Sequence, residues 1–129
     1  PAMNFLRFDG TVEKGDNTVS LNGQQFEIPT QLQGASGELV FGVRPEQVTI
    51  RQDSAYAGEV IAVEYLGTTQ IITIDTANGM IKARASSGQI VKVGEKIGLD
   101  FNPAAITLFE KSTGRALVSN ANQGVLENG

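Results

Sequence analysis

The stretch LVFGVRPEQVTI, residues 39–50, decides the fold of this chain. Its first half has an apolar residue at every second position, which is the pattern of a β-strand with one buried face. Pro45 fixes its own φ and keeps Arg44 out of the helical region, so the strand must end there. Apolar alternation resumes after the proline. The stretch therefore predicts a strand, a tight corner and a second strand.

A second stretch, IGLDFNPAAITL, residues 97–108, repeats this arrangement. Pro103 aligns with Pro45. The apolar residues also align, since Leu39, Phe41, Val43, Val48 and Ile50 fall on Ile97, Leu99, Phe101, Ile106 and Leu108. A Gly-x-Val segment precedes each stretch, at a different spacing. We interpret the repeat as two similar strand–corner–strand units that bury their apolar faces against each other in a barrel or sandwich.

Turn signals divide the remainder of the chain into short strands as well. Asn22–Gly23 and Asn78–Gly79 each mark a hairpin, because these residues adopt the positive φ that two-residue hairpin turns require. Residues 30–37 are polar and predict a loop, and only residues 35–40 and 103–105 have room for a helical turn. The fold class is therefore all-β, a barrel or sandwich of about ten short strands with negligible helix.

Composition excludes several function classes. The chain has 129 residues, a formal charge of −4 and a pI of about 4.7, so we expect no nucleic-acid partner. It has no His and no Cys, which removes the usual general base, thiolate nucleophiles and the usual zinc ligands. No apolar run is long enough for a membrane helix. We therefore expect no catalytic, cofactor or metal residues, and a module that acts by binding.

The corner in the opening stretch is the first candidate for a contact with a partner. Gly42 permits a close backbone approach, and Pro45 suits the first position of a helical turn. Arg44 and Glu46 add charge, and the guanidinium fork suits loop carbonyls or a carboxylate. A purely structural corner and a contact with a neighbouring loop or subunit both remain open.

Two further groups of side chains are candidates. Phe109 falls on the strand face opposite Leu108, so it predicts an exposed aromatic contact with a partner, although a core position is the alternative. Hydroxyls near two predicted turns could contact an oxyanion if backbone N–H groups converge beside them: Thr68, Thr69, Ser86 and Ser87.

Four motifs in the same order give the chain a family resemblance: PAMNFL, VRPEQV, GEVIAVEYLG and LFEKSTGRAL. Together they resemble the C-terminal, transport-associated OB (TOBE) domain of ATP-binding subunits of bacterial ABC importers for carbohydrates, polyols and glycerol phosphate, of the maltose-importer type. The resemblance spans Pro1 to about Leu117. One departure is Gln47, where many relatives have His. The resemblance implies an OB-type regulatory domain over residues 1–117 and a loosely ordered tail over residues 118–129.

The resemblance also implies a role and partners. The chain would be the regulatory domain without its ATPase, since no phosphate-binding loop is present; ATP and Mg²⁺ would belong to the parent subunit, and this chain would not be an enzyme. Expected partners are a second copy, the parent's ATPase domain, the membrane permease subunits indirectly and a regulatory protein. The expected place is the cytoplasmic side of the inner membrane, as a peripheral protein. The alternative is an OB-type module that binds a small oxyanion.

Overall fold

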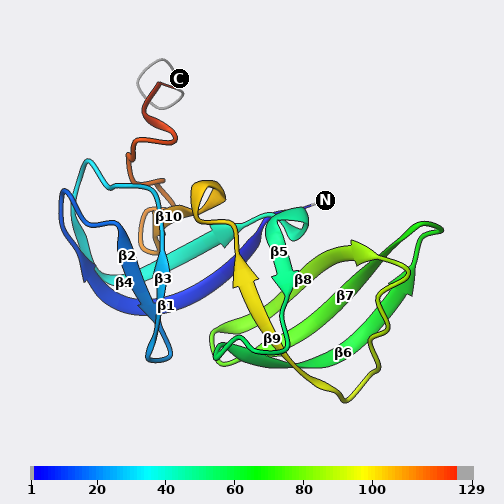
Figure 1. Ribbon diagram of the computed structural model, residues 1–129. Helices are drawn as coiled ribbons and strands as arrows, with labels where there is room; N and C mark the ends of the chain where they lie inside the picture. The colour runs from blue at the N-terminus through cyan, green and yellow to red at the C-terminus, as the bar shows by residue number, and fades with distance from the viewer. Residues whose placement is uncertain (1, 125–129) are drawn as a thin grey trace.

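The computed structural model describes residues 2–124, which form ten strands and two single-turn 3₁₀ helices (Figure 1). The strands are β1 (Asn4–Val12), β2 (Thr18–Leu21), β3 (Gln24–Glu27), β4 (Ala35–Val43), β5 (Val48–Ile50), β6 (Ala57–Tyr65), β7 (Thr69–Thr76), β8 (Gly79–Ser86), β9 (Lys96–Phe101) and β10 (Thr107–Glu110). The 3₁₀ turns are η1 (Pro45–Gln47) and η2 (Pro103–Ala105). The prediction of an all-β chain with about ten strands is confirmed.

The strands pair antiparallel in sheets with the orders β1-β4-β10, β2-β3 and β5-β9-β6-β7-β8. Figure 1 shows two lobes, one built from β1 to β4 with β10 and the other from β6 to β8, with β5 and β9 between them. One hydrophobic cluster runs through both lobes and includes Leu6, Phe41, Ile72 and Leu99. The molecule therefore has a single core that both lobes share.

The two repeated units exchange strands. β4 of the first unit pairs with β10 of the second, and β5 of the first pairs with β9 of the second. The register is the same in both pairs: Phe41 lies opposite Leu108, and the aligned Leu99 lies opposite Ile50. Each unit has a buried strand that needs a partner and a corner that turns the chain away from it. The predicted pair of strand–corner–strand units is therefore present, and each unit completes the other's sheet.

Side chains join the first strand to the second lobe. The amide of Asn4 donates to the carbonyl of Lys82 at 2.8 Å and accepts from the N–H of Lys82 at 2.8 Å, as a backbone partner in a β-ladder would. Asn78 makes a second pair of bonds with Arg7, donating through Nδ2 at 2.9 Å and accepting its N–H at 3.1 Å. These contacts fix β1 along β8 and hold the lobes together.

The turns and loops of the structure agree with the predictions in part. Asn22 and Gly23 have φ values of 49° and 81°, which confirms the first hairpin turn. In the second hairpin Thr76 lies opposite Gly79, so the loop residues are Ala77 and Asn78 rather than Asn78 and Gly79. Residues 35–40 form no helical turn, and the loop ends earlier than predicted. The missing helical turn and the shorter loop have one cause: pairing along β1 extends β4 to Ala35 in spite of its polar sequence.

Residues 117–122 return to the first lobe and lie against residues 30–32. Leu117 and Ser119 are buried, and backbone hydrogen bonds run from Leu32 N–H to Val118 at 2.8 Å and from Asn120 N–H to Thr30 at 3.0 Å. The predicted tail begins at residue 118, so its first residues are hydrogen-bonded to the domain. Residues 125–129 of that predicted tail lie outside the described part of the chain.

Candidate functional site

The corner that was singled out in the sequence is made by its backbone and by Pro45. The proline is buried, and the N–H of Gln47 closes the turn on the carbonyl of Arg44 at 2.9 Å. The side chains of Arg44 and Glu46 are exposed and make no hydrogen bond or ion pair with any residue in the range 2–124. Both charged groups are therefore available to something outside this domain.

The two corners are joined to each other. Asn102 donates its N–H to the carbonyl of Gln47 at 3.0 Å and its side-chain amide to Gln47 Oε1 at 2.8 Å. Its own Oδ1 accepts the N–H of Ala104 at 3.2 Å and so caps η2. Sequence analysis noted Gln47 only as a departure from a family pattern and missed Asn102, because the two are far apart in the chain. The amide pair fixes the second corner against the first.

Gly42 and Phe109, two separately predicted residues, are in contact. A Cβ built on Gly42 would lie 2.7 Å from Cε2 of Phe109 and 2.8 Å from Sδ of Met3, so the glycine gives these side chains their place. The half-buried ring of Phe109 packs edge-to-face on Phe5 with 5.8 Å between centroids, and Phe5 is 55% exposed. The pair forms an exposed apolar surface beside β1 and β10.

Phe5 borders two hollows, and Phe109 borders the smaller of them. One, of about 310 Å³, is lined by Phe5, Phe109, Arg7, Val40, Glu110, Lys111 and Gly114. The other, of about 620 Å³, runs from Phe5 and Met3 past Pro45 to the outer face of β7 and β8, where Met80 is exposed. Large exposed apolar side chains next to hollows are typical of protein–protein contact surfaces. We call Met3, Phe5, Met80 and Phe109 the apolar patch.

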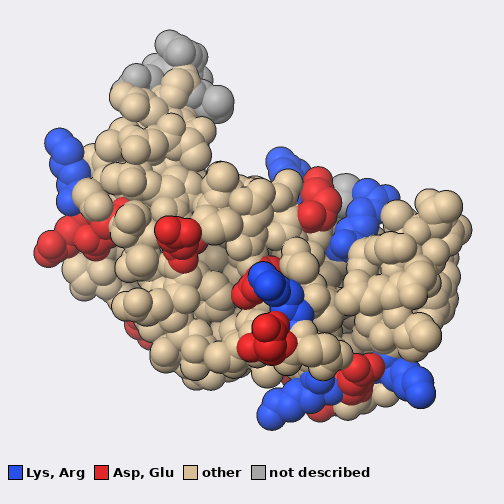
Figure 2. All heavy atoms as spheres, viewed as in Figure 1, with Lys and Arg blue, Asp and Glu red and all other residues tan. Residues whose placement is uncertain are grey.

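The four hydroxyl residues are brought together where β7 begins and β8 ends, at the end of these strands that is away from the hairpin turn. Thr69 lies opposite Ser86, and the N–H of Ser87 donates to the carbonyl of Thr68 at 3.0 Å. The N–H groups of Gly88 and Gln89 are also used, by Ser86 Oγ at 3.2 Å and by its carbonyl at 3.0 Å. Local turns thus occupy the donors that an anion needs. On the face seen in Figure 2, charged side chains are absent from the outer end of the β6–β7 hairpin.

A polar groove of about 760 Å³, which we call the β3 groove, lies between β3 and the β5–β9 pair. Its lining comes from β3, η1, β5, the loop after β5, β9 and the start of η2: Gln24, Gln25, Phe26, Glu27, Glu46, Gln47, Thr49, Arg51, Ser54, Ala55, Tyr56, Asp100, Phe101, Asn102 and Pro103. The sequence did not predict this groove. The sequence signal for it was the polar run RQDSA directly after β5.

An aromatic cluster supports the groove. The centroid of Phe26 lies 5.2 Å from that of Tyr56 and 5.2 Å from that of Phe101, both in edge-to-face geometry. Tyr56 and Phe101 are only 3% and 9% exposed, so their faces are packed against protein rather than open to the groove. The cluster therefore holds β3 at its distance from β9.

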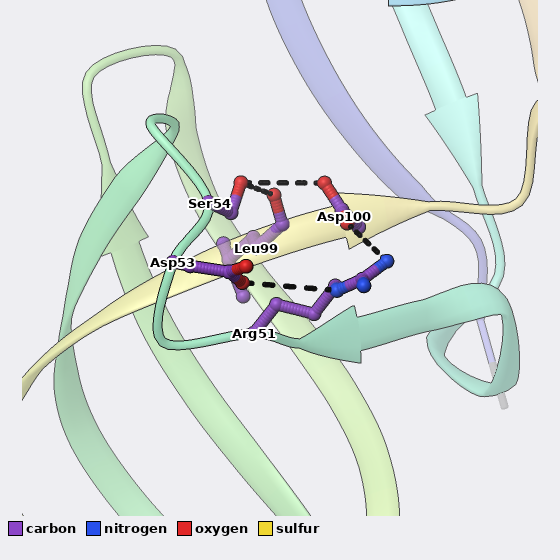
Figure 3. Close-up of polar contacts among 5 residues, drawn as sticks. All are labelled: Arg51, Asp53, Ser54, Leu99 and Asp100. Carbon is purple, nitrogen blue, oxygen red and sulfur yellow. Dashed lines mark hydrogen bonds and ion pairs between the residues drawn. The ribbon is translucent and has the colours of Figure 1, made fainter.

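Asp100 is the centre of the polar contacts on the groove wall. Figure 3 shows it between Ser54 and Arg51. Nη1 of Arg51 donates to Oδ2 of Asp100 at 3.2 Å. Ser54 Oγ donates to the carbonyl of Leu99 at 2.6 Å and lies 3.3 Å from Asp100 Oδ1. A partly exposed ion pair of this kind contributes about 0–1 kcal/mol. Its main effect is to orient the carboxylate and the loop after β5.

Burial shifts the pKa of Tyr56, a residue that lines the groove. Its hydroxyl donates to Asn78 Oδ1 at 2.6 Å and contacts Thr76 Oγ1 at 3.2 Å. Burial raises the pKa of this hydroxyl above its ordinary value and outweighs the two hydrogen bonds, which lower it. The neutral hydroxyl thus links the loop after β5 to the β7–β8 hairpin. No cluster of metal-binding side chains and no helix able to span a membrane occur in residues 2–124.

The comparisons with known proteins identify the family. A sequence profile of the TOBE domain matches residues 41–109, from the end of β4 into β10. The chain belongs to the TOBE domain family. The match contains both corners, the β5–β9 pair, the three strands β6, β7 and β8, and part of the β4–β10 pair.

Curated relatives of this TOBE domain are ATP-binding proteins of importers. The chain is 30% identical to the trehalose/maltose import ATP-binding protein MalK of Thermococcus litoralis and 30% identical to the sn-glycerol-3-phosphate import ATP-binding protein UgpC 2 of Agrobacterium fabrum. It is 34% identical to the xylose/arabinose import ATP-binding protein XacK of Haloferax volcanii. Each match covers 91% of this chain but only 35%, 32% and 32% of the relative. The chain thus spans about a third of their length.

A solved structure has the same fold. The cytoplasmic molybdate-binding protein ModG, with molybdate bound, aligns with a TM-score of 0.62 over 81% of this chain and 94% of the other, at 15% identity. At that identity the likeness shows a shared fold. The predicted OB-like architecture and the predicted family are both confirmed.

Proposed function

We propose that this chain is the non-catalytic regulatory and dimerisation domain of the ATP-binding subunit of an importer for a sugar, a polyol or glycerol phosphate. The observation that carries the proposal is the match along 91% of the chain to ATP-binding proteins of such importers. ATP and Mg²⁺ would be bound by the ATPase domain of the parent subunit. The subunit would lie on the cytoplasmic side of the membrane and contact the permease subunits through that ATPase domain.

The apolar patch supports the dimerisation part of the proposal. The net charge of −4 repels a second copy, and burial of the exposed apolar side chains of the patch would offset that repulsion. Pro45 lines the same hollow as Phe5, and the exposed Arg44 precedes Pro45 in the corner. A two-fold contact would bring each patch against its copy. A regulator that prefers one arrangement of the dimer would then shift the transport cycle.

Sedimentation equilibrium of residues 1–129 tests this assembly. We expect a concentration-dependent dimer that Phe5→Ser weakens. Ile90→Ser is the matched control, because Ile90 is the most exposed large apolar side chain of the described residues and lies outside the patch. Strict monomers at millimolar concentration would contradict dimerisation by the isolated domain. Calorimetry with ATP should show no binding; micromolar affinity would contradict the non-catalytic assignment.

The oxyanion alternative is tested separately. ModG is described as molybdate-binding and shares the fold, which is why molybdate, sulfate and glycerol phosphate belong in a thermal-shift screen of this chain. Under the regulatory proposal none of them raises the melting temperature. Stabilisation by one of them that Ser86→Ala or Thr68→Val removes would favour the oxyanion alternative instead.

A further inference from the structure

The hairpin β2–β3 leaves one edge of β3 without a strand beside it. Ile28 donates its N–H to Asn17, and the two-residue turn bonds Leu21 to Gln24. The backbone N–H and C=O groups of every second residue of β3 therefore point toward β2. The backbone N–H and C=O groups of Gln25 and Glu27 consequently point the other way. No strand pairs with that edge within residues 2–124. Gln25 and Glu27 both line the β3 groove.

The chain itself adds a short strand to the continuation of this segment. Gln31 faces residues 15 and 16 through its backbone, while its neighbours Thr30 and Leu32 bond to Asn120 and Val118 on the other side. Gln31 and Ser119 thus form an antiparallel bridge. The extended run that begins with β3 therefore accepts an added strand at residues 30–32 and has an open edge at residues 25–27.

The groove along this edge is long rather than round. The β3 groove of about 760 Å³ meets a second hollow of about 440 Å³, and both are lined by Glu27 and Pro103. The second hollow continues past Pro29 towards Asn120, where the added strand already lies. An extended peptide backbone fits such a channel better than a compact ligand does.

The charges of the groove select the peptide. Glu27, Glu46 and Asp100 line it, and Arg51, the cation on its wall, is paired with Asp100. The surplus is negative and favours Lys or Arg side chains on the incoming segment. A sugar is less well matched, because a sugar needs an open aromatic face and Tyr56 and Phe101 are buried beneath the groove.

We propose that the β3 groove binds an extended basic peptide segment of a partner protein, which adds as a strand to the free edge of β3. Backbone bonds to Gln25 and Glu27 give the affinity, and alternate side chains of the peptide meet Glu46 and Asp100. That this partner is a regulator rests on the regulatory function proposed above. The groove itself is independent of dimerisation, since the apolar patch has none of its residues.

Display selection with a library of random peptides about ten residues long, using residues 1–129 as bait, tests the groove. We expect enriched peptides with Lys or Arg at alternating positions. Gln25→Pro removes an outward N–H without breaking a bond to β2, and should weaken these peptides about tenfold. Glu27→Lys should weaken them similarly. Glu59→Lys is the control, because Glu59 is an exposed β6 residue outside the groove and the same charge change there should leave binding intact.

A second measurement does not depend on whether the variants fold. In an added strand, only every second N–H of the peptide bonds to β3. Methylating those backbone nitrogens of an enriched peptide should abolish binding, and methylating the intervening ones should leave binding intact. Amide shifts in an NMR titration should centre on residues 24–27. The proposal would be overturned by a selection that enriches no peptide or enriches acidic peptides. It would also be overturned by amide shifts centred elsewhere, or by equal binding of the two methylated peptides. None of these results depends on the self-association assay, so the two proposals fail separately.

Discussion

Replacing Gly42 by Ala is the sharpest test of the packing beneath the apolar patch. Gly42 in β4 lies opposite Thr107 in β10. The added methyl would be 2.7 Å from Cε2 of Phe109, 2.8 Å from Sδ of Met3 and 3.1 Å from the carbonyl of Thr107. Carbon atoms in good contact are about 3.5–4.0 Å apart, so the ring and the thioether must both move.

The cost follows from which neighbours can yield. Met3 is half-buried and flexible, so its sulfur can rotate away for little free energy. Phe109 is rigid and held edge-to-face on Phe5, so its ring must leave that contact or push β10 away from β4. Overpacking of this kind costs about 1–3 kcal/mol, and we expect about 2 kcal/mol of lost unfolding free energy. For a domain of this size that lowers Tm by roughly 6–10 °C.

A double-mutant cycle measured by urea unfolding isolates the clash. Gly42→Ala should cost about 2 kcal/mol alone but less than about 1 kcal/mol in a Phe109→Ala background, a coupling of at least about 1 kcal/mol. Gly88→Ala is the matched control; its methyl meets only Ser86 Oγ at 3.6 Å, and stability should stay the same or rise by up to about 1 kcal/mol. Additive costs in the cycle would refute the described contact between Gly42 and Phe109.

Three further outcomes follow from other contacts. Asn4→Leu should cost about 2 kcal/mol in urea unfolding, because it removes both bonds to Lys82 and leaves backbone groups unpaired; a loss below about 0.5 kcal/mol would contradict that link. The pKa of Tyr56 is raised in the folded state, so its contribution to stability is complete below the ordinary value of 10.0 and is lost as pH rises through the folded pKa. Urea midpoints of the wild type should therefore fall more steeply with pH in that window than those of Tyr56→Phe. Parallel curves would contradict this. Arg44→Ala should change unfolding free energy by less than about 0.5 kcal/mol, since its side chain is exposed and unpaired within residues 2–124, and should weaken self-association in sedimentation; an unchanged dimer would argue against a role for this guanidinium.

The parts of the fold that the sequence predicted are those with local causes. Pro45 and Pro103 end strands through their own ring geometry, and Asn22–Gly23 supplies the positive φ of a hairpin turn. Alternation of apolar residues marks the buried face of a strand whatever its partner is. The two corners and most strands were therefore predictable residue by residue.

The strand order and the groove depend on contacts between distant residues. Nothing near Gln47 in sequence indicates that Asn102 is its partner, and Asn4 acts as a ladder partner for Lys82 only because β1 lies along β8. The start of β4 at Ala35 likewise follows from pairing with β1. Sequence alone could name Phe109, Gly42 and the corner as candidates, but not that the ring fills the space that the glycine leaves.

The exchange of strands between the two corner units has a consequence for folding. Val48 meets Phe101 about 50 residues along the chain, and Phe41 meets Leu108 at a still larger separation, so loop closure must precede most of the stabilising contacts. Neither unit can complete its sheet alone. Slow, cooperative folding in one step is therefore expected, in the range of non-local β-proteins, with no half-folded lobe that persists by itself. A refolding experiment that follows the aromatic cluster and the β7–β8 hairpin separately should give one common rate.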